Sequence, residues 1–275
     1  MLNAHPDSAT KDDAQVRVNL KVWSGGNFVR DYDSRNLRPA EIILLVRHAK
    51  AFAGRVLELG CGAGRLTGYL VELADEVRGI DVSLAMVEHC RGVYPGGMFS
   101  VEDLRNLSSF DSQSFDVVVG ANNVLDVLGD SERRQALREI GRILKPEGIV
   151  AVSSHNRAYI PKLRKPTDLR GARNIVRAAG KLVLMPWRER NRRRLAPFER
   201  SEPDYALVND DAHDFRLLHY YISRDAQERQ LDEEGLRLVE CLDGEGHVVA
   251  DGESAPDWAE LYYVAHLPDR THATG

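Results

Sequence analysis

Three glycines in a five-residue turn are the first residues of this sequence that could do chemistry. Gly60, Gly62 and Gly64 follow a short apolar run and open a helical pattern. Glycine lets the backbone turn sharply and approach a ligand closely, and the free N–H groups of a helix N-terminus attract an anionic group. A second apolar run ends at Asp81, where a carboxylate can accept hydrogen bonds from ribose hydroxyls. The pattern predicts a bound nucleoside cofactor.

Histidines supply the candidates for proton transfer. His155 directly follows the apolar run of residues 149–153, which predicts a buried strand. We interpret it as a general base or as a group that orients the acceptor, with a purely structural histidine as the alternative. His213, His219 and Tyr221 would share one face if they lie on one strand leading out of residues 157–222. Packing beneath a cap is the alternative for these three.

A basic segment stands out on an acidic chain. Residues 157–200 hold 14 Lys and Arg against three acids, a local charge of +11 on a chain of −5, so the remainder carries −16. Five arginines lie between Arg188 and Arg194, beside Trp187. Arginine favours phosphate and carboxylate, so an anionic small molecule or peptide is one interpretation, and RNA is a second. A solvated helix paired with the protein's own acids is the third, and the acidic remainder disfavours a long polyanion.

The remaining composition predicts a cytoplasmic protein without a membrane segment or a metal. No apolar run approaches the ~20 residues that span a bilayer, and no N-terminal signal pattern appears. The cysteines show neither disulfide nor zinc spacing, which favours a reducing compartment. They are Cys61, Cys90 and Cys241. No metal-ligand cluster has a recognisable spacing, although Asp126 with Asn122 and Asn123 leaves a carboxylate site open.

Five sequence elements, covering residues 52–155, resemble the motifs of the class I S-adenosylmethionine (SAM) methyltransferases. The glycine turn with Glu58 two residues before it resembles the first motif of that family. The other four are Asp81 to Met86, Glu102 to Leu104, Phe115 to Val119 with Asn122, and Leu144 to Gly148 before the run 149–153. A nicotinamide oxidoreductase is the weaker alternative, because its G-x-G-x-x-G pattern needs a third glycine and Gly68 lies too far into the helix.

The resemblance implies an α/β fold with a Rossmann-like, doubly wound and mostly parallel sheet of seven strands. The sheet would end in an antiparallel C-terminal hairpin, and a substrate cap would be inserted in the chain. The predicted organisation is a flexible tail (1–15) and one domain (16–275), made of an N-terminal lid and helix (16–50), a SAM-binding core (51–156), a cap insertion (157–222) and a C-terminal helix and hairpin (223–275).

The resemblance also implies a set of cofactor-binding residues. Glu58 would lie near the methionine part of SAM and Asp103 near the adenine. Arg35 or Arg38 would lie near the cofactor carboxylate. Tyr32 would face the sulfonium, which an aromatic ring attracts, and it joins His155 and His219 as a catalytic candidate. The full cofactor set is Glu58, Gly60, Cys61, Gly62, Gly64, Arg65, Asp81, Val82, Met86, Asp103, Leu104, Asn122 and Arg38.

The implied reaction is methyl transfer from SAM, leaving S-adenosylhomocysteine, to a hydroxyl, amine or carboxylate of a small biosynthetic intermediate. The acceptor could be a natural product, a modified peptide or a sugar, aligned in a lidded pocket for in-line displacement. Residues 120–124 lack the Asn/Asp-Pro-Pro-aromatic motif, which disfavours planar amide and base nitrogens as acceptors. An RNA methyltransferase and a non-catalytic SAM-binding protein are the alternatives. The oligomeric state stays open.

Overall fold

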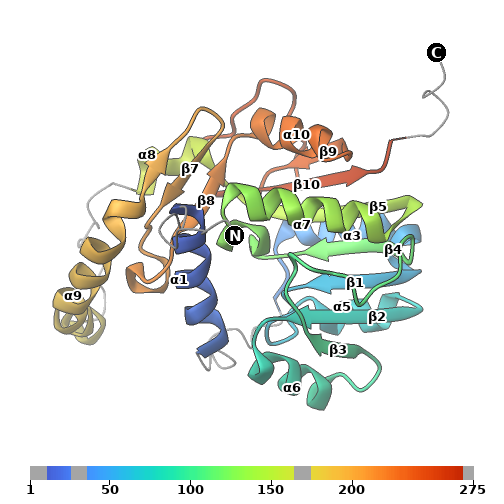
Figure 1. Cartoon of the computed structure of the whole chain (residues 1–275), viewed down its shortest axis with the longest axis horizontal. Helices are drawn as coiled ribbons and strands as arrows, with labels where there is room; N and C mark the ends of the chain where they lie inside the picture. The colour runs from blue at the N-terminus through green and yellow to red at the C-terminus, as the bar shows by residue number, and fades with distance from the viewer. Residues whose placement is uncertain (1–10, 26–35, 164–174, 269–275) are drawn as a thin grey trace, which may run out of the picture.

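A central sheet with helices on both faces organises the chain (Figure 1). The computed structural model describes residues 11–25, 36–163 and 175–268. Seven strands run in the order β3 (Met98–Val101), β2 (Glu76–Asp81), β1 (Arg55–Leu59), β4 (Phe115–Gly120), β5 (Leu144–Asn156), β10 (Glu260–His266) and β9 (Arg237–Leu242). The first five are parallel, whereas β10 is antiparallel to both β5 and β9. The predicted doubly wound sheet with its antiparallel C-terminal pair is confirmed.

The sheet is nevertheless larger than the seven strands predicted, because it has ten strands in the described part of the chain. Three strands from the insertion extend it, namely β6 (Arg200–Ser201), β7 (Tyr205–Val208) and β8 (His219–Ile222). Strand β4 ends at Gly120, which pairs with Val152, while β5 continues for four more residues. The free edge of His155 and Asn156 pairs in parallel with β8. The insertion therefore reaches the carboxyl end of the sheet, where the candidate site lies.

Alternating side chains give the sheet a buried core on each face. Val56 and Val117 pack on one side with helices α3 (Pro39–Arg47), α4 (Ala49–Phe52) and α5 (Thr67–Leu73). Leu57 and Val118 pack on the other side with α7 (Asp130–Ile143) and α10 (Arg224–Glu233). Helix α6 (Leu84–Val93) covers β2 and β3. Such two-sided burial explains why apolar side chains lie on both faces of β1 and β4, as is typical of parallel strands.

The first helix begins nearer the N-terminus than predicted. Helix α1 (Lys11–Gly25) lies between the sheet and α9 (Ile175–Leu195) of the insertion (Figure 1). The Gln15 and Asn19 side chains are fully buried. Both donate to the Leu218 carbonyl before β8, at 3.3 and 2.7 Å. Residues 11–15 of the predicted flexible tail are therefore helical, whereas residues 1–10 lie outside the described residues. Gln15 and Asn19 are buried by hydrogen bonding and leave no apolar signal in the sequence.

The remaining short elements surround the carboxyl edge. They are the 3₁₀ turns η1 (Val124–Val127), η2 (Arg157–Tyr159), η4 (Ala196–Phe198) and η5 (Ala212–Phe215), and the helix α8 (Ile160–Leu163). In the part of the chain that the structure describes, every helix is too short or too polar to cross a bilayer. The subdivision of the domain into lid, core and cap stays a prediction.

Candidate cofactor and acceptor site

The glycine turn follows β1 in a backbone conformation that requires glycine. Gly60, Gly62 and Gly64 have φ angles of +61°, +54° and +85°. Residues with a Cβ avoid this left-handed region. A Cβ at Gly64 would also lie 2.2 Å from the ring of Tyr94. The spacing of the three glycines is thus a direct record of the turn geometry.

Asp81 ties the glycine turn to the end of β2. Its Oδ2 accepts a hydrogen bond from the Gly62 N–H at 3.0 Å, and its Oδ1 accepts from the Ser83 N–H at 2.8 Å. Burial raises the pKa of Asp81, although these two backbone donors act in the opposite direction. The carboxylate therefore lies beside the turn, and its predicted contact with a ribose stays a prediction.

Glu58 is the buried acid below the turn. Its side chain is 3% exposed and accepts a hydrogen bond of 2.5 Å from the Thr67 hydroxyl, at the start of α5. Burial raises the pKa of Glu58 to about 8. The carboxyl is therefore largely protonated at neutral pH in the ligand-free chain.

Two of the predicted cofactor contacts are arginines that already have partners. Arg65 forms a two-pronged ion pair with Glu41 of α3, at 2.5 and 2.6 Å, and reaches Asn122 Oδ1 at 3.3 Å. Arg38 pairs with Glu260 at the start of β10. Both arginines therefore fix the N-terminal segment against the sheet, and their contact with SAM stays a prediction. Tyr32 and Arg35 lie outside the described residues.

The other predicted cofactor residues follow strands β1 to β4. Cys61 is buried, and both its contact with Cys90 and its burial raise the pKa of its thiol, which argues against reactivity. Asp103 forms an ion pair with Arg105 at 2.6 Å, which lowers its pKa despite partial burial. Val82 is partly exposed, whereas Met86 and Leu104 are buried. Carboxyl ends of parallel strands share one edge, so these residues border the same face of the site.

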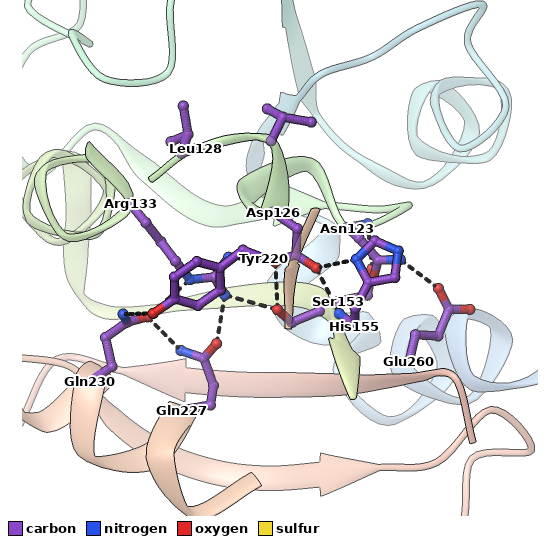
Figure 2. A network of polar contacts seen from close by, with 12 residues as sticks. Asn123, Asp126, Leu128, Arg133, Ser153, His155, Tyr220, Gln227, Gln230 and Glu260 are labelled. Atoms are coloured by element: carbon purple, nitrogen blue, oxygen red, sulfur yellow. Dashed lines mark hydrogen bonds and ion pairs between the residues drawn. The ribbon is translucent and has the colours of Figure 1, made fainter. Parts of the chain in front are cut away.

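His155 is held by a carboxylate at the carboxyl end of β5. Its Nδ1 lies 2.7 Å from Oδ2 of Asp126 in η1, and its backbone N–H donates to the same oxygen at 2.6 Å (Figure 2). Nε2 lies 3.3 Å from the amide nitrogen of Asn123. These contacts fit a ring with a proton on Nδ1, which the carboxylate accepts, and a lone pair on Nε2, which the amide N–H of Asn123 meets. The basic nitrogen therefore faces the loop after β4.

His219 forms a second carboxylate–histidine pair. Its Nδ1 lies 2.8 Å from Oδ2 of Asp210, which also accepts from the Tyr221 hydroxyl at 2.7 Å. The ring centroids of His155 and His219 are 5.0 Å apart, and that of Tyr221 is 4.7 Å from His155. Although burial acts the other way, the charge of Asp210 raises the pKa of His219. The structure brings the two predicted catalytic candidates His155 and His219 together, and their catalytic roles stay predictions.

His213 was expected on the same strand as His219, and this was wrong. It lies in the 3₁₀ turn η5 with a φ of +49°, because the chain reverses there before β8 begins. Its ring still approaches His219, with centroids 6.4 Å apart. Burial, followed by the nearby His219, lowers the pKa of His213 to about 4. His213 and His219 therefore lie near each other although they are not on the same strand.

Sequence reasoning missed Asp210 and Arg133, and it considered Asp126 only for a carboxylate site with Asn122 and Asn123. His155, Asp210 and His219 lie close enough to hold a metal ion, with ligand atoms within 4.8 Å of one another. However, Oδ2 of Asp210 already accepts from His219 and Tyr221, and Oδ1 accepts from the Ala212 N–H. We therefore interpret the group as hydrogen-bonded pairs. No spacing in the sequence could have shown it, because strand pairing brings the residues together.

The basic segment lies on α9 and is partly neutralised. Arg192 and Arg193 both bind Glu189, at 2.8 and 2.7 Å, and Arg188 lies 3.4 Å from Asp214 of η5. The side chains of Arg192 and Arg193 remain more than half exposed. The segment can thus still meet an anionic partner, which stays a prediction.

Comparison with known proteins gives this arrangement a family. A profile for a methyltransferase domain matches residues 56–148, from β1 to the start of the apolar half of β5. The core is a class I SAM-dependent methyltransferase domain. SAM is therefore the cofactor of this domain, and the glycine turn, Asp81 and Glu58 all lie within the matched residues.

Several relatives share part of this methyltransferase domain. The malonyl-[acyl-carrier protein] O-methyltransferase of Salmonella typhimurium is 31% identical over 155 residues, which are 55% of this chain and 60% of that protein. The trans-aconitate 2-methyltransferase of Methylobacterium nodulans is 31% identical over 144 residues, 52% of this chain and 53% of that protein. The chain therefore matches less than two thirds of either relative.

Solved structures extend the similarity of fold beyond the domain. The 1,6-didemethyltoxoflavin-N1-methyltransferase of Burkholderia thailandensis, crystallised with bound 1,6-didemethyltoxoflavin and S-adenosylhomocysteine, has a TM-score of 0.59 at 15% identity, over 97% of this chain and 94% of that one. The CcbJ methyltransferase of Streptomyces caelestis has a TM-score of 0.55 at 21% identity, over 88% and 95%. At such identities the likeness concerns the fold.

Proposed function

We propose that this chain transfers the methyl group of SAM to a small biosynthetic intermediate, with a hydroxyl as the acceptor group that the site suits best. The observation that carries the proposal is the His155–Asp126 pair, at the end of β5 and beside the loop after β4. Asp126 binds the proton on Nδ1, so Nε2 is the atom that could accept a proton from a hydroxyl. A neutral amine or a carboxylate would not need this base.

The cofactor would lie across the carboxyl ends of β1 to β4, against the glycine turn, Asp81 and Asp103. Methyl transfer from a sulfonium is an in-line displacement, in which the enzyme aligns the acceptor and excludes water. The acceptor would then approach from the side of β5 and β8, where His155, His219 and Tyr221 meet. Residues 16–50 and 157–222 would form the cap over this pocket.

The names of the relatives suggest the first acceptors to test. Malonyl-[acyl-carrier protein] and trans-aconitate are both acids, and the exposed arginines of α9 support an anionic small molecule or peptide. Nucleic acid is disfavoured, because the chain outside residues 157–200 carries a charge of −16. Hydroxy acids therefore combine the acceptor group favoured by His155 with the charge favoured by α9.

Turnover with a panel of acceptors tests the proposal. The purified chain is incubated with SAM and hydroxy acids, simple acids, amines or RNA, and S-adenosylhomocysteine is measured. With an active acceptor, we expect His155→Gln to lower kcat about 10²–10⁴-fold while SAM affinity is unchanged. The control is His247→Gln, because His247 is an exposed histidine in the loop after β9.

Each contrary result has a clear meaning. Full activity in His155→Gln would show that His155 is not the general base, and it would favour an amine or carboxylate acceptor. SAM binding without turnover on any acceptor would favour the non-catalytic alternative. Turnover restricted to RNA would assign the exposed arginines of α9 to nucleic-acid binding.

A further inference from the structure

Arg133 is a fully buried cation behind the His155–Asp126 pair. It lies on α7 with 0% exposure and stacks on the ring of Tyr220, with its guanidinium carbon 4.8 Å from the ring centroid. A buried charge is costly unless a counter-charge and hydrogen bonds satisfy it. The acceptors are Asp126 Oδ1 at 2.5 Å, Gln227 at 2.6 Å and Gln230 at 2.9 Å (Figure 2). Ser154 Oγ accepts as well, at 3.0 Å.

Asp126 divides its two oxygens between Arg133 and His155. Oδ1 accepts from Arg133 and from the Ser154 hydroxyl, whereas Oδ2 accepts from the backbone and ring of His155. Asp126 is fully buried, so its charge has few sources of compensation besides these donors. The positive charge of Arg133 balances it on the side away from the imidazole. The imidazole is therefore held by a carboxylate without being required as its counter-ion.

The second pair is built differently. The Asp210 carboxylate accepts from Tyr221, Ala212 and His219, and among these donors His219 is the one that can carry a positive charge. The His155 and His219 rings, 5.0 Å apart, therefore each contact a carboxylate. The carboxylate of Asp126 is already neutralised by Arg133. Two neighbouring histidines in such different surroundings can hold different protonation states at the same pH.

We propose that Arg133 is a positioning residue that keeps His155 neutral in its Nδ1–H tautomer, while His219 carries the positive charge of the site. That His155 then accepts a proton from the methyl acceptor rests on the proposed function. The protonation states of the two histidines do not depend on it. The charged and titratable groups around His155 are Asp126 of η1, Arg133 of α7, Glu260 of β10 (through Asn123), His219 and Tyr221 of β8, and Asp210.

The test is nitrogen-15 NMR of the full chain with labelled histidine at pH 7.5, without any acceptor. The His155 signals are assigned by their loss in His155→Gln. For the unaltered chain we expect a protonated Nδ1 and an unprotonated Nε2. In Arg133→Gln, Asp126 loses its counter-charge and draws a proton onto His155, so the signal of the unprotonated nitrogen should be lost. Arg133→Lys restores the charge and should restore the neutral ring.

The matched control is Arg134→Gln, on the next residue of the same helix. Arg134 pairs with Asp130, Glu233 and Glu234 on the surface, so its loss should leave the His155 signals unchanged. The proposal is overturned if folded Arg133→Gln keeps a neutral His155. If that variant does not fold, the unaltered chain still decides, because an imidazolium or an Nε2–H tautomer at His155 contradicts the proposal.

Activity gives a second readout once an acceptor is known. We expect Arg133→Gln to lower kcat at pH 7.5 by ~10-fold or more, with recovery at higher pH as His155 loses its extra proton. The KM for the acceptor should change much less. Equal loss at every pH would indicate a structural role alone. A neutral His155 in a chain without methyl transfer would leave this inference standing and refute the proposed function.

Discussion

Replacing Glu58 with Gln should make the ligand-free protein more stable, and increasingly so as the pH rises. Burial raises the pKa of Glu58 from 4.5 to about 8, so the folded chain holds a proton that the unfolded chain releases above pH 4.5. The stability linked to this carboxyl is complete below pH 4.5 and is lost as the pH rises towards 8. At about 1.4 kcal/mol for each pH unit, the loss between pH 5 and pH 8 is roughly 3–4 kcal/mol.

Glutamine removes this penalty because it is neutral in both states. Its carbonyl can still accept the hydrogen bond of Thr67, which lies 2.5 Å from the Glu58 oxygen. For a domain of this size the gap in Tm between Glu58→Gln and the unaltered chain should widen by roughly 10 °C from pH 5 to pH 8.

The assay is thermal unfolding by circular dichroism at pH 5, 6, 7 and 8, without SAM. Glu72→Gln is the control, because Glu72 is an exposed carboxyl on the same helix as Thr67. Its melting curves should follow those of the unaltered chain at every pH. Parallel Tm profiles for Glu58→Gln and the unaltered chain would refute the reasoning, since Glu58 would then not be held in its protonated form.

Three further substitutions test the turn, the ribose carboxylate and the N-terminal helix. Gly64→Ala should cost about 2 kcal/mol or more in urea unfolding, because φ is +85° and the Cβ meets Tyr94, whereas Gly92→Ala on α6 has free space and should be neutral or stabilising. Asp81→Asn should weaken S-adenosylhomocysteine binding at least ~10-fold by calorimetry, since it loses a charged acceptor; unchanged affinity would exclude a ribose contact. Asn19→Ala should cost about 2 kcal/mol of unfolding free energy by stranding buried backbone groups at Val127 and Leu218, and a loss below about 0.5 kcal/mol would contradict the observed packing of α1.

The core of the fold and the cofactor edge could be predicted from the sequence because their signals are local. The apolar runs of β1 and β4 are buried on both faces, and the glycines of the turn record positive φ angles. The glycine turn and Asp81 could be predicted as parts of one cofactor site, because each directly follows a recognisable apolar strand and the carboxyl ends of parallel strands share one edge.

The acceptor side needed the tertiary structure, because its residues come from distant segments. Strand β8 adds to β5 only where β4 has already ended, and this pairing alone brings His219 and Asp210 to His155. Arg133 has the sequence pattern of an exposed helix arginine, yet it is fully buried. Burial of polar groups is decided by partners far along the chain, since hydrogen bonds, unlike apolar periodicity, leave no regular spacing in the sequence.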